Sequence, residues 1–185
     1  MESAYNLLNY LSDQEYKIHG WRDSLLNRTR NADEWKFNKE DIKTDYESIH
    51  QQYLNICEQS DDEFIRLEVL KRLIFLNWYY VLEPEFLTGI KKLDTVAMFN
   101  SYKILNSYIQ ERKLDDELTW MLKFYSSWEY IIFEYSEGKL NELTSFVEEV
   151  DTTKLNFPKQ QLTKGIMDNR GQMGIYWKKL VEKPD

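Results

Sequence analysis

Two acidic triplets are the residues of this chain whose type and spacing come closest to those of a metal site. They are Asp61-Asp62-Glu63 and Asp115-Asp116-Glu117, and an aromatic-rich segment follows each. A site of the Asp-Asp-x-x-Asp kind, which holds a metal ion or a diphosphate, would need a further acid at position 65 or 119, where the chain has Ile65 and Thr119. Carboxylates are also favoured in the first turn of a helix, by its dipole and its unpaired backbone N–H groups. We therefore predict that both triplets start helices and bind no metal.

The histidines and the single cysteine have too few partners for a metal or catalytic site. Glu47 and His50 share the Glu-x-x-His spacing of di-iron bundles, which need two such pairs, and the only other histidine is His19. Two histidines are also too few for a three-histidine zinc site. Cys57 follows His50 by seven residues, about 10.5 Å along a helix axis, which is too far for a base that would activate the thiol. We predict a buried Cys57, and no catalytic residue, metal or cofactor.

The segment from Asp168 to Trp177 is the part of the chain that helix packing explains least. Gly171 and Gly174 would let another group approach the backbone closely, and the planar guanidinium of Arg170 can bind a carboxylate or a phosphate. Asp168 or Asn169 would cap the helix that follows. Ordinary helix punctuation is the alternative interpretation. Because binding groups concentrate on loops held by a rigid scaffold, we predict a binding site at five residues: Asp168, Arg170, Gly171, Gly174 and Trp177.

A second irregular connection, from Glu83 to Gly89, carries a proline, a phenylalanine and a terminal glycine. The proline disfavours helical geometry at the residue before it, so the preceding helix must end there. The same argument about loops makes Glu85, Thr88 and Gly89 candidates for binding, again with helix punctuation as the alternative.

Three polar residues interrupt two strongly apolar segments and are candidates for buried polar groups. Asn77 stands between Leu76 and Trp78, and we predict that it is buried with hydrogen-bond partners, because an unsatisfied amide costs a few kcal/mol. Glu129 and Glu134 stand among aromatic and aliphatic residues. A carboxylate buried there would pair with a lysine or arginine, or its pKa would rise. The alternative is a helix face that reaches solvent.

These candidate residues lie on segments whose apolar spacing predicts helices. The segments Ser60–Pro84 and Leu114–Gly138 match at an offset of 54 residues, and their apolar residues recur with the helical period of 3.6. We predict an all-α fold, a single-domain bundle of residues 1–185 with about six to eight helices. Two antiparallel hairpins, roughly residues 39–82 and 94–136, would place two nearly fully apolar helices in the core. The match also suggests a weak internal duplication.

Capping and breaking residues predict where the first helices begin and end. A helix runs from Ser3 to about Arg30, and Gly20 would divide it. Asn38 would cap a second helix, which carries a stripe of apolar residues from Ile42 to Cys57. This stripe predicts a surface helix that lays one face on the core.

The later helices are bounded in the same way. Ser60 and Glu63 form a capping box at the start of the first central helix. A helix capped by Asp94 would run to Arg112. The second central helix would run without interruption from Asp115 to Gly138, and a further amphipathic helix would cover residues 140–150.

Composition and charge limit the kind of protein this chain can be. Of its 185 residues, 42% are hydrophobic and 30% are charged, which is ordinary for a globular protein. A net charge of −8 argues against a sequence-independent nucleic-acid binder, which needs clustered Lys and Arg, and it favours a basic protein partner. Aromatic residues make up 15%, which suits both wide helix seams and binding surfaces.

The chain shows no pattern for export or for a membrane. Its start lacks the basic stretch followed by an apolar run that marks a signal peptide. The longest apolar stretch, Leu73 to Leu82, would rise about 15 Å as a helix, half of a bilayer core. One cysteine allows no internal disulfide and fits a reducing compartment. We therefore predict a cytoplasmic protein that contacts no membrane.

Three classes of function remain. The first is a non-enzymatic, acidic interaction module that binds a basic protein, as an inhibitor or immunity-type protein does. The second is an enzyme or small-molecule binder whose pocket lies between the central helices, with Glu129 or Glu134 as acid or base and Arg170 as anion anchor. The third is a homo-oligomer whose aromatic faces are subunit contacts. Glycine-rich phosphate loops, dinucleotide-binding patterns and nucleophile elbows are absent, so we rank the interaction module first.

Overall fold

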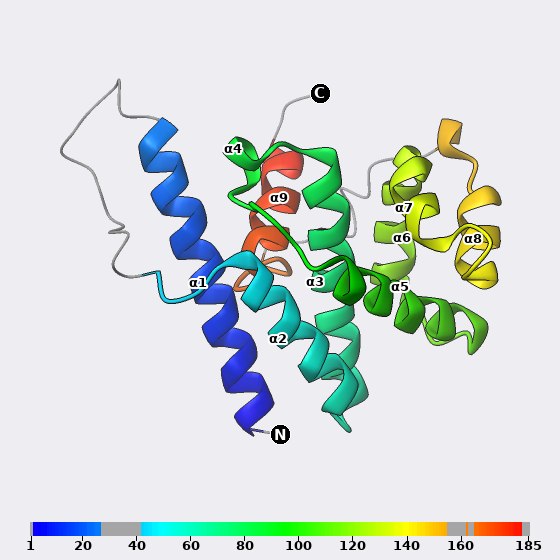
Figure 1. Ribbon diagram of the computed structural model, residues 1–185, viewed down its shortest axis with the longest axis horizontal. Coiled ribbons are helices and arrows are strands. Elements are labelled where there is room, and N and C mark those ends of the chain that lie inside the picture. The colour runs from blue at the N-terminus through cyan, green and yellow to red at the C-terminus, as the bar shows by residue number, and fades with distance from the viewer. Residues whose placement is uncertain (1, 27–41, 155–161, 163–164, 183–185) are drawn as a thin grey trace.

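A computed structural model describes residues 2–26, 42–154, 162 and 165–182, and these residues form helices and no strand (Figure 1). The predicted all-α bundle is confirmed, with eight helices of eight or more residues and one single-turn helix in the described part of the chain. The helices are α1 (Glu2–Leu26), α2 (Tyr46–Gln59), α3 (Glu63–Leu82), α4 (Glu85–Thr88), α5 (Thr95–Gln110), α6 (Asp116–Tyr125), α7 (Glu129–Ser136), α8 (Asn141–Glu148) and α9 (Gly171–Glu182).

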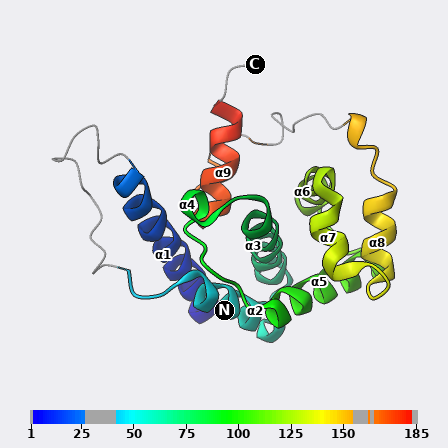
Figure 2. The ribbon, with the colours of Figure 1, turned by 45° about the horizontal axis from the view of Figure 1, so that its top comes forward.

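The central helix of the molecule is α3. It packs against α1, α2, α4, α5, α6, α7 and α9, and Figure 2 shows it in the middle of the others. All six residues from Leu73 to Trp78 are buried, as predicted for an apolar helix that other helices surround. No helix among the described residues is long and apolar enough to cross a membrane.

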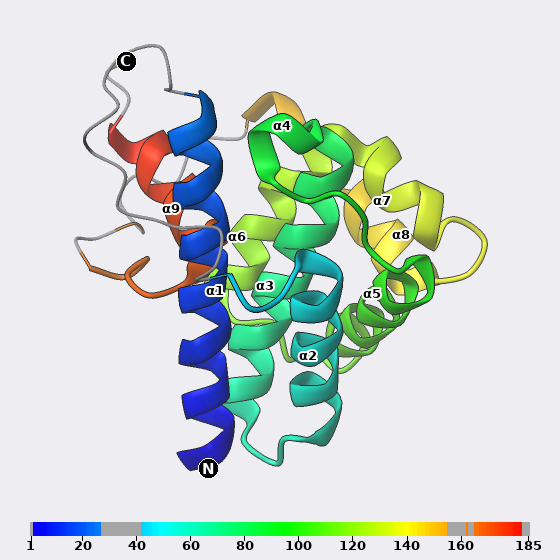
Figure 3. The same cartoon turned by 60° about the vertical axis from the view of Figure 1, so that its left-hand side comes forward.

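The first predicted hairpin is confirmed, but it begins later than predicted. α2 and α3 run antiparallel and pack along each other (Figure 3). The backbone from Ile42 to Asp45 is not helical, and α2 starts at Tyr46 because the Asp45 carboxylate accepts a hydrogen bond from the backbone N–H of Ser48 at 2.9 Å. The predicted cap, Asn38, lies outside the described residues.

Both acidic triplets start helices, as predicted. The Asp62 carboxylate accepts the backbone N–H of Phe64 at 2.9 Å, and the Asp115 carboxylate accepts that of Leu118 at 2.7 Å. The predicted capping box is therefore wrong, because Asp62 takes the N-cap position of α3 and Ser60 ends α2 instead. The two caps are 53 residues apart, one fewer than the sequence offset, and internal duplication stays a hypothesis.

The second predicted hairpin is wrong, because its long central helix is divided. A 3-10 turn, Ser126–Trp128, separates α6 from α7. The Ser126 hydroxyl donates to the backbone oxygen of Leu122 at 2.8 Å, and Trp128 leaves helical geometry with φ −121° and ψ 56°. The preceding helix, α5, is capped by Asp94 as predicted, but it packs chiefly on α8 and α3 rather than along α6.

The first helix, α1, is continuous through Gly20, so the predicted break there is wrong. A glycine in a helix interior costs about 1 kcal/mol relative to alanine. Contacts on both sides of Gly20 offset this cost: His19 Nδ1 lies 3.1 Å from a carboxylate oxygen of Asp23, one turn on, and Arg22 donates to the backbone oxygen of Leu87 in α4. α1 also packs against α9 and α2.

Much of the aromatic surplus lies in one cluster between α3, α6 and α9. Trp78 and Tyr125 stack with their ring centroids 4.7 Å apart, and Trp177 meets Trp120 edge to face at 4.7 Å. The ring of Phe124 lies 5.0 Å from that of Trp177. Edge-to-face and offset contacts of this kind add to the free energy gained from burial, so the cluster ties α9 to the centre of the bundle.

Candidate functional site

Arg170, the strongest anion-binding candidate, lies in the core and binds carboxylates of its own chain. It is only 7% exposed. Its Nε donates to Glu68 Oε1 at 2.9 Å, and its Nη2 donates to Glu117 Oε2 at 3.0 Å. Nη1 completes the contact with Glu117, and Nη2 that with Glu68. The guanidinium therefore binds carboxylates, one of the two anions expected for it. These carboxylates come from α3 and α6 of the same chain, and they occupy the hydrogen-bond donors of Arg170 that an external anion would need.

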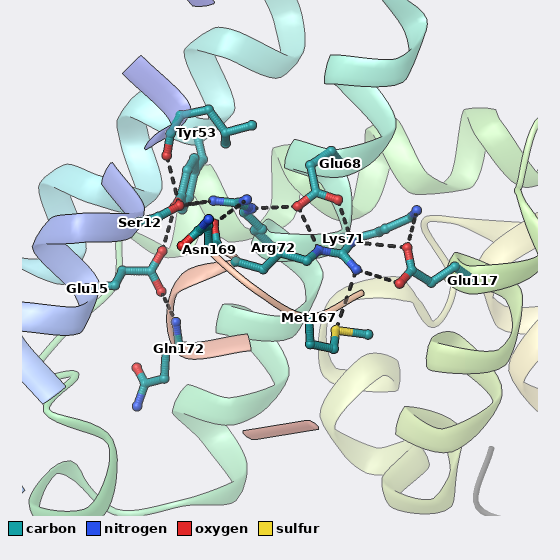
Figure 4. Close-up of polar contacts among 12 residues, drawn as sticks. Ser12, Glu15, Tyr53, Glu68, Lys71, Arg72, Glu117, Met167, Asn169 and Gln172 are labelled. Atoms are coloured by element: carbon teal, nitrogen blue, oxygen red, sulfur yellow. Dashed lines mark hydrogen bonds and ion pairs between the residues drawn. The ribbon is translucent and has the colours of Figure 1, made fainter. Parts of the chain in front are cut away.

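Arg170 belongs to a larger set of buried and half-buried charges, many of which Figure 4 shows. Arg72 Nε donates to the same Glu68 oxygen at 2.9 Å, and the Arg72 guanidinium also reaches the Tyr53 hydroxyl at 3.3 Å. Lys71 Nζ lies 2.6 Å from a carboxylate oxygen of Glu117 and 2.6 Å from one of Asp115. We call this set, together with Glu15, the ionic network; its members are Glu15, Tyr53, Glu68, Lys71, Arg72, Asp115, Glu117 and Arg170.

The Glu15 carboxylate joins the network to the start of α9. It accepts the Tyr53 hydroxyl at 2.5 Å and the backbone N–H of Gln172 at 2.8 Å. Burial raises the pKa of Glu15, although these hydrogen bonds and the charge of Arg72 act in the opposite direction. The cap predicted from Asp168 or Asn169 is thus replaced by a carboxylate from α1. Asp168 is exposed and pairs with Lys178 instead.

Arg170 and Lys71 favour the ionised form of Glu117. Burial alone would raise the pKa of Glu117, but the hydrogen bonds and charges of Arg170 and Lys71 outweigh it and lower that pKa. Apart from Tyr53, the members of the network are three basic and four acidic side chains. An arrangement this closely matched can fix how α1, α3, α6 and α9 pack, because an unpaired buried charge is costly.

The two glycines near Arg170 permit close approach, as predicted, but the approaching groups belong to the chain itself. Gly171 has a left-handed backbone with φ +57°, and a Cβ there would lie 2.5 Å from Glu15 Oε1. A Cβ on Gly174 would collide with the backbone oxygen of Met167. Trp177, another predicted binding residue, is fully buried in the aromatic cluster. Packing therefore accounts for all three residues.

The structure brings the two predicted binding loops together. The side-chain amide of Gln172 donates to the backbone oxygen of Thr88 at 2.8 Å, and Thr88 is fully buried. The Thr88 hydroxyl accepts the backbone N–H of Ile90 at 3.0 Å. Gly89 ends α4 in a left-handed conformation with φ +75°, and Glu85 is exposed. Gly89 also lines a pocket, which is described below.

Asn77 is fully buried, as predicted, and it bridges two other helices. Its Oδ1 lies 2.8 Å from His50 Nε2 in α2, and its Nδ2 donates to the Ser101 hydroxyl in α5 at 2.7 Å. Since Nδ2 is the donor of this amide, Oδ1 accepts from a protonated His50 Nε2. Burial lowers the pKa of His50 to about 4, so the ring is neutral at pH 7.

Glu47 and His50 do not face a common ligand. Glu47 pairs with Lys92 at 3.0 Å on the surface, whereas His50 points into the core. Cys57 is fully buried, as predicted, and burial raises the pKa of its thiol to about 12. Within the described ranges, no group of three or more His, Cys, Asp or Glu side chains could hold a metal ion.

Glu129 and Glu134 are exposed, so they are not the buried polar groups for which they were candidates, and the alternative interpretation, a helix face that reaches solvent, applies. The buried face of α7 is carried by Ile131, Ile132 and Ser136 instead. The two glutamates belong to the unit formed by α7, its turn and α8, residues 129–151, which we call the acidic helix pair. This unit contains seven carboxylates and one lysine, a formal charge of −6 in a chain whose total is −8.

The acidic helix pair leaves its glutamates without cationic partners. The six are Glu129, Glu134, Glu137, Glu142, Glu148 and Glu149; all are exposed, and no lysine or arginine of the described residues forms an ion pair with any of them. The one lysine of the unit, Lys139, lies over the ring of Phe99 at 5.9 Å. Tyr130 stands among these glutamates and is 58% exposed.

Two pockets open on the other side of α3. One, of about 680 Å³, lies between α1, α2 and the turn before α3. The other, of about 440 Å³, lies between α1, the start of α2 and the segment that follows α4. Neither is lined by Glu129, Glu134 or Arg170, so the acid, base and anion anchor expected for an enzyme do not share either pocket.

Sequence reasoning missed most of the ionic network. Glu68, Lys71 and Arg72 lie on α3 next to the fully buried residues Val69 and Leu70, and that interruption of an apolar face was the available signal. Their partners lie up to 102 residues away in the chain, so spacing could not pair them. Comparison with known protein families, characterised proteins and solved structures finds no match.

Proposed function

We propose that this protein is a non-enzymatic interaction module that binds a basic surface of another protein through the acidic helix pair. The observation that carries the proposal is the set of six exposed glutamates that form no ion pair with a lysine or arginine of the described residues. Several carboxylates elsewhere are matched: Glu68 and Glu117 pair with buried cations, and Glu47 pairs with Lys92. A concentrated charge of one sign steers an oppositely charged partner and selects against others.

Four of these glutamates lie where a negative charge destabilises a helix, which supports a role in binding rather than in folding. Glu134 and Glu137 lie at the C-terminal end of α7, and Glu148 and Glu149 at that of α8. The helix dipole disfavours negative charge at a C-terminus, and neither helix has a basic residue in its last turn. Residues that break a local stability rule without a compensating contact are expected at functional surfaces.

The exposed ring of Tyr130 gives the same surface an apolar contact. Tyrosine is enriched among residues that dominate binding energy, and its face attracts the guanidinium of arginine. An inhibitor or immunity-type protein that masks a basic enzyme is the kind of interaction protein this combination fits. A homodimer through the same surface is disfavoured, because two copies would bring like charges together. We place the module in the cytoplasm, where its single buried thiol, Cys57, would stay reduced.

The proposal is tested by capture of a partner from the native host with three forms of the protein. The first is the unchanged protein. The second carries Glu134→Gln, Glu137→Gln and Glu148→Gln in the acidic helix pair. The third carries the same change of charge elsewhere, as Glu58→Gln, Asp61→Asn and Glu85→Gln, all at exposed positions. We expect a basic protein to be captured by the first and third forms and lost by the second.

The salt dependence provides a further criterion. A contact between the acidic helix pair and a basic surface should weaken steeply between about 50 and 500 mM salt, because exposed charges are screened over about 10 Å at 0.1 M. Equal loss of the partner with the second and third forms would contradict the proposal, since net charge alone would then explain the binding. Capture of an acidic partner would contradict it as well.

A further inference from the structure

The pocket of about 440 Å³ beside Gly89 has the size and walls of a small-ligand site. Its apolar walls come from Ile18 and Trp21 of α1, from Ile42 in the segment before α2, and from Tyr46, the first residue of α2. The segment after α4 closes a third side. The helices α1 and α2, which contribute residues to this pocket, lie on the side of α3 away from α7 and α8 (Figure 1).

Gly89 lets the segment after α4 lie directly on these walls. Its φ of +75° favours glycine, and a Cβ there would be 3.2 Å from Ile18 Cγ2 and 3.7 Å from Tyr46 Cε2. Gly89 was one of the residues that the sequence marked for binding. Its backbone conformation thus shapes one side of the pocket between two apolar side chains.

The charged side chains at the rim of the pocket differ in whether they form hydrogen bonds or ion pairs. The Asp45 carboxylate accepts the backbone N–H of Ser48 at 2.9 Å, and this hydrogen bond lowers the pKa of Asp45. Glu47 pairs with Lys92 at 3.0 Å. Lys91 is exposed and forms no ion pair within the described part of the chain. Lys91 is therefore the rim charge that has neither a hydrogen bond nor an ion pair within the described residues, whereas the ionised Asp45 is held as the cap of α2.

We propose that this pocket binds a small aromatic carboxylate, with its ring between Trp21 and Tyr46 and its anionic group at Lys91. Aromatic walls recognise the flat ring, because stacked and edge-to-face contacts add to the burial of apolar area. Lys91 supplies a compact positive charge on a flexible stem that reaches the rim. The site is independent of the acidic helix pair, so neither proposal depends on the other.

Three probes that share one ring and differ in charge test the proposal by calorimetry: 2-naphthylacetate, 2-(2-naphthyl)ethanol and 2-(2-naphthyl)ethylamine. We expect the carboxylate to bind most tightly and the amine least. Lys91→Gln should weaken the carboxylate about two- to five-fold, to the level of the alcohol, which is the range of an exposed charge pair. The matched control, Lys123→Gln, changes an exposed lysine of α6 and should have no effect.

A second variant tests the location. Thr44→Trp adds a large ring to the pocket wall and should abolish binding of all three probes in a protein whose thermal melt is unchanged. Should that variant fail to fold, nuclear Overhauser contacts between the naphthyl protons and the methyl groups of Ile18 and Ile42 in the unchanged protein serve instead. Equal affinity for the carboxylate and the alcohol, equal effects of Lys91→Gln and Lys123→Gln, contacts elsewhere, or no binding at millimolar probe would each overturn the proposal.

Discussion

At position 171, both the backbone conformation and a tertiary contact disfavour any residue other than glycine. Its left-handed backbone alone makes alanine cost about 1–2 kcal/mol. A Cβ would also meet the Glu15 carboxylate, which caps α9. We expect Gly171→Ala to lower the free energy of unfolding by roughly 3–5 kcal/mol, measured by urea denaturation. Gly138 is the matched control, because its φ is +68° and a Cβ added there would meet no atom within 4 Å.

The excess of Gly171→Ala over Gly138→Ala isolates the contact with Glu15. In the double variant Gly171→Ala/Glu15→Ala the clash is gone. Its loss of unfolding free energy should therefore be smaller, by at least about 1 kcal/mol, than the sum of the losses in the two single variants. Strict additivity, or equal losses for the two glycine variants, would show that the carboxylate does not restrict residue 171.

His50 makes stability depend on pH. Burial lowers its pKa from 6.5 to about 4, so the unfolded chain binds the proton more readily than the folded one. The stabilising contribution of the neutral ring is complete above pH 6.5 and is lost as pH falls toward 4, by roughly 3 kcal/mol over the whole interval. His50→Gln keeps a donor for Asn77 but does not titrate. We expect its stability to fall less than that of the unchanged protein between about pH 7 and pH 4.5.

His19 serves as the internal control for this measurement. Burial lowers its pKa to about 4 as well, and it is retained in both proteins, so its contribution cancels in the difference. If the unfolding free energies of the two proteins run parallel over the same pH interval, His50 does not account for the pH dependence.

For single residues, the sequence predicted which side chains form buried polar contacts better than it predicted which residues they contact. Asn77 was predicted to be buried with hydrogen-bond partners, because it stands in the middle of an apolar helix. It is fully buried and hydrogen-bonded to His50 and Ser101. The guanidinium of Arg170 was expected to bind a carboxylate or a phosphate, and the carboxylates it binds, Glu68 and Glu117, come from 102 and 53 residues away. The burial of Glu134 was left open, because neighbours in sequence do not reveal which face of a helix meets solvent.

At the scale of elements, α9 is held by charge as well as by its aromatic residues. Arg170→Met would leave Glu68 and Glu117 buried without this partner. Breaking a buried pair costs about 3–5 kcal/mol, and we expect the lower end because Arg72 and Lys71 still contact the two carboxylates. Hydrogen exchange should accelerate most in α9 and least in α2 and α3.

An exposed ion pair on the same helix provides the control. Lys178→Met breaks the contact with Asp168, whose side chain is 57% exposed, and should cost less than about 1 kcal/mol. Equal costs for Arg170→Met and Lys178→Met, or unchanged exchange in α9, would mean that the ionic network does not hold this helix.

The two central segments show how far periodicity predicts elements. α3 has apolar residues on every side over residues 73–78, and it is surrounded as that pattern requires. The match at residues 114–138 looked equally apolar, yet Ser126 and Ser127 fall where the helix divides into α6 and α7. Serine competes for backbone hydrogen bonds, which a hydrophobic pattern does not register. The start of α2 was missed for a similar reason, since the apolar stripe begins at Ile42, whereas the side chain that caps the helix is that of Asp45.

At the scale of the whole molecule, negative charge is concentrated on one side of α3. The acidic helix pair carries −6 of the total −8. Because several of these glutamates oppose the helix dipoles and one another, replacing Glu134, Glu137 and Glu148 by glutamine should raise the free energy of unfolding by roughly 1–2 kcal/mol at low salt. Urea denaturation at about 20 mM and about 1 M salt would measure this gain.

High salt should reduce that gain, because screening removes the repulsion that the substitutions relieve. The variant with Glu58, Asp61 and Glu85 changed is the control for net charge and should gain less. A triple variant of the acidic helix pair that is less stable than the unchanged protein would mean that these glutamates have stabilising partners within the fold.

The long reach of Arg170 also sets an order for folding during synthesis. Glu68 and Glu117 leave the ribosome before the arginine that neutralises them, and the nearer of the two precedes it by 53 residues. At roughly 5–20 residues per second, this interval is about 3–10 s. During it, Arg72 and Lys71 can already contact the two carboxylates, but the cation that joins Glu68 to Glu117 is still missing. The ionic network can therefore reach its final pairing only after the segment before α9 has been translated.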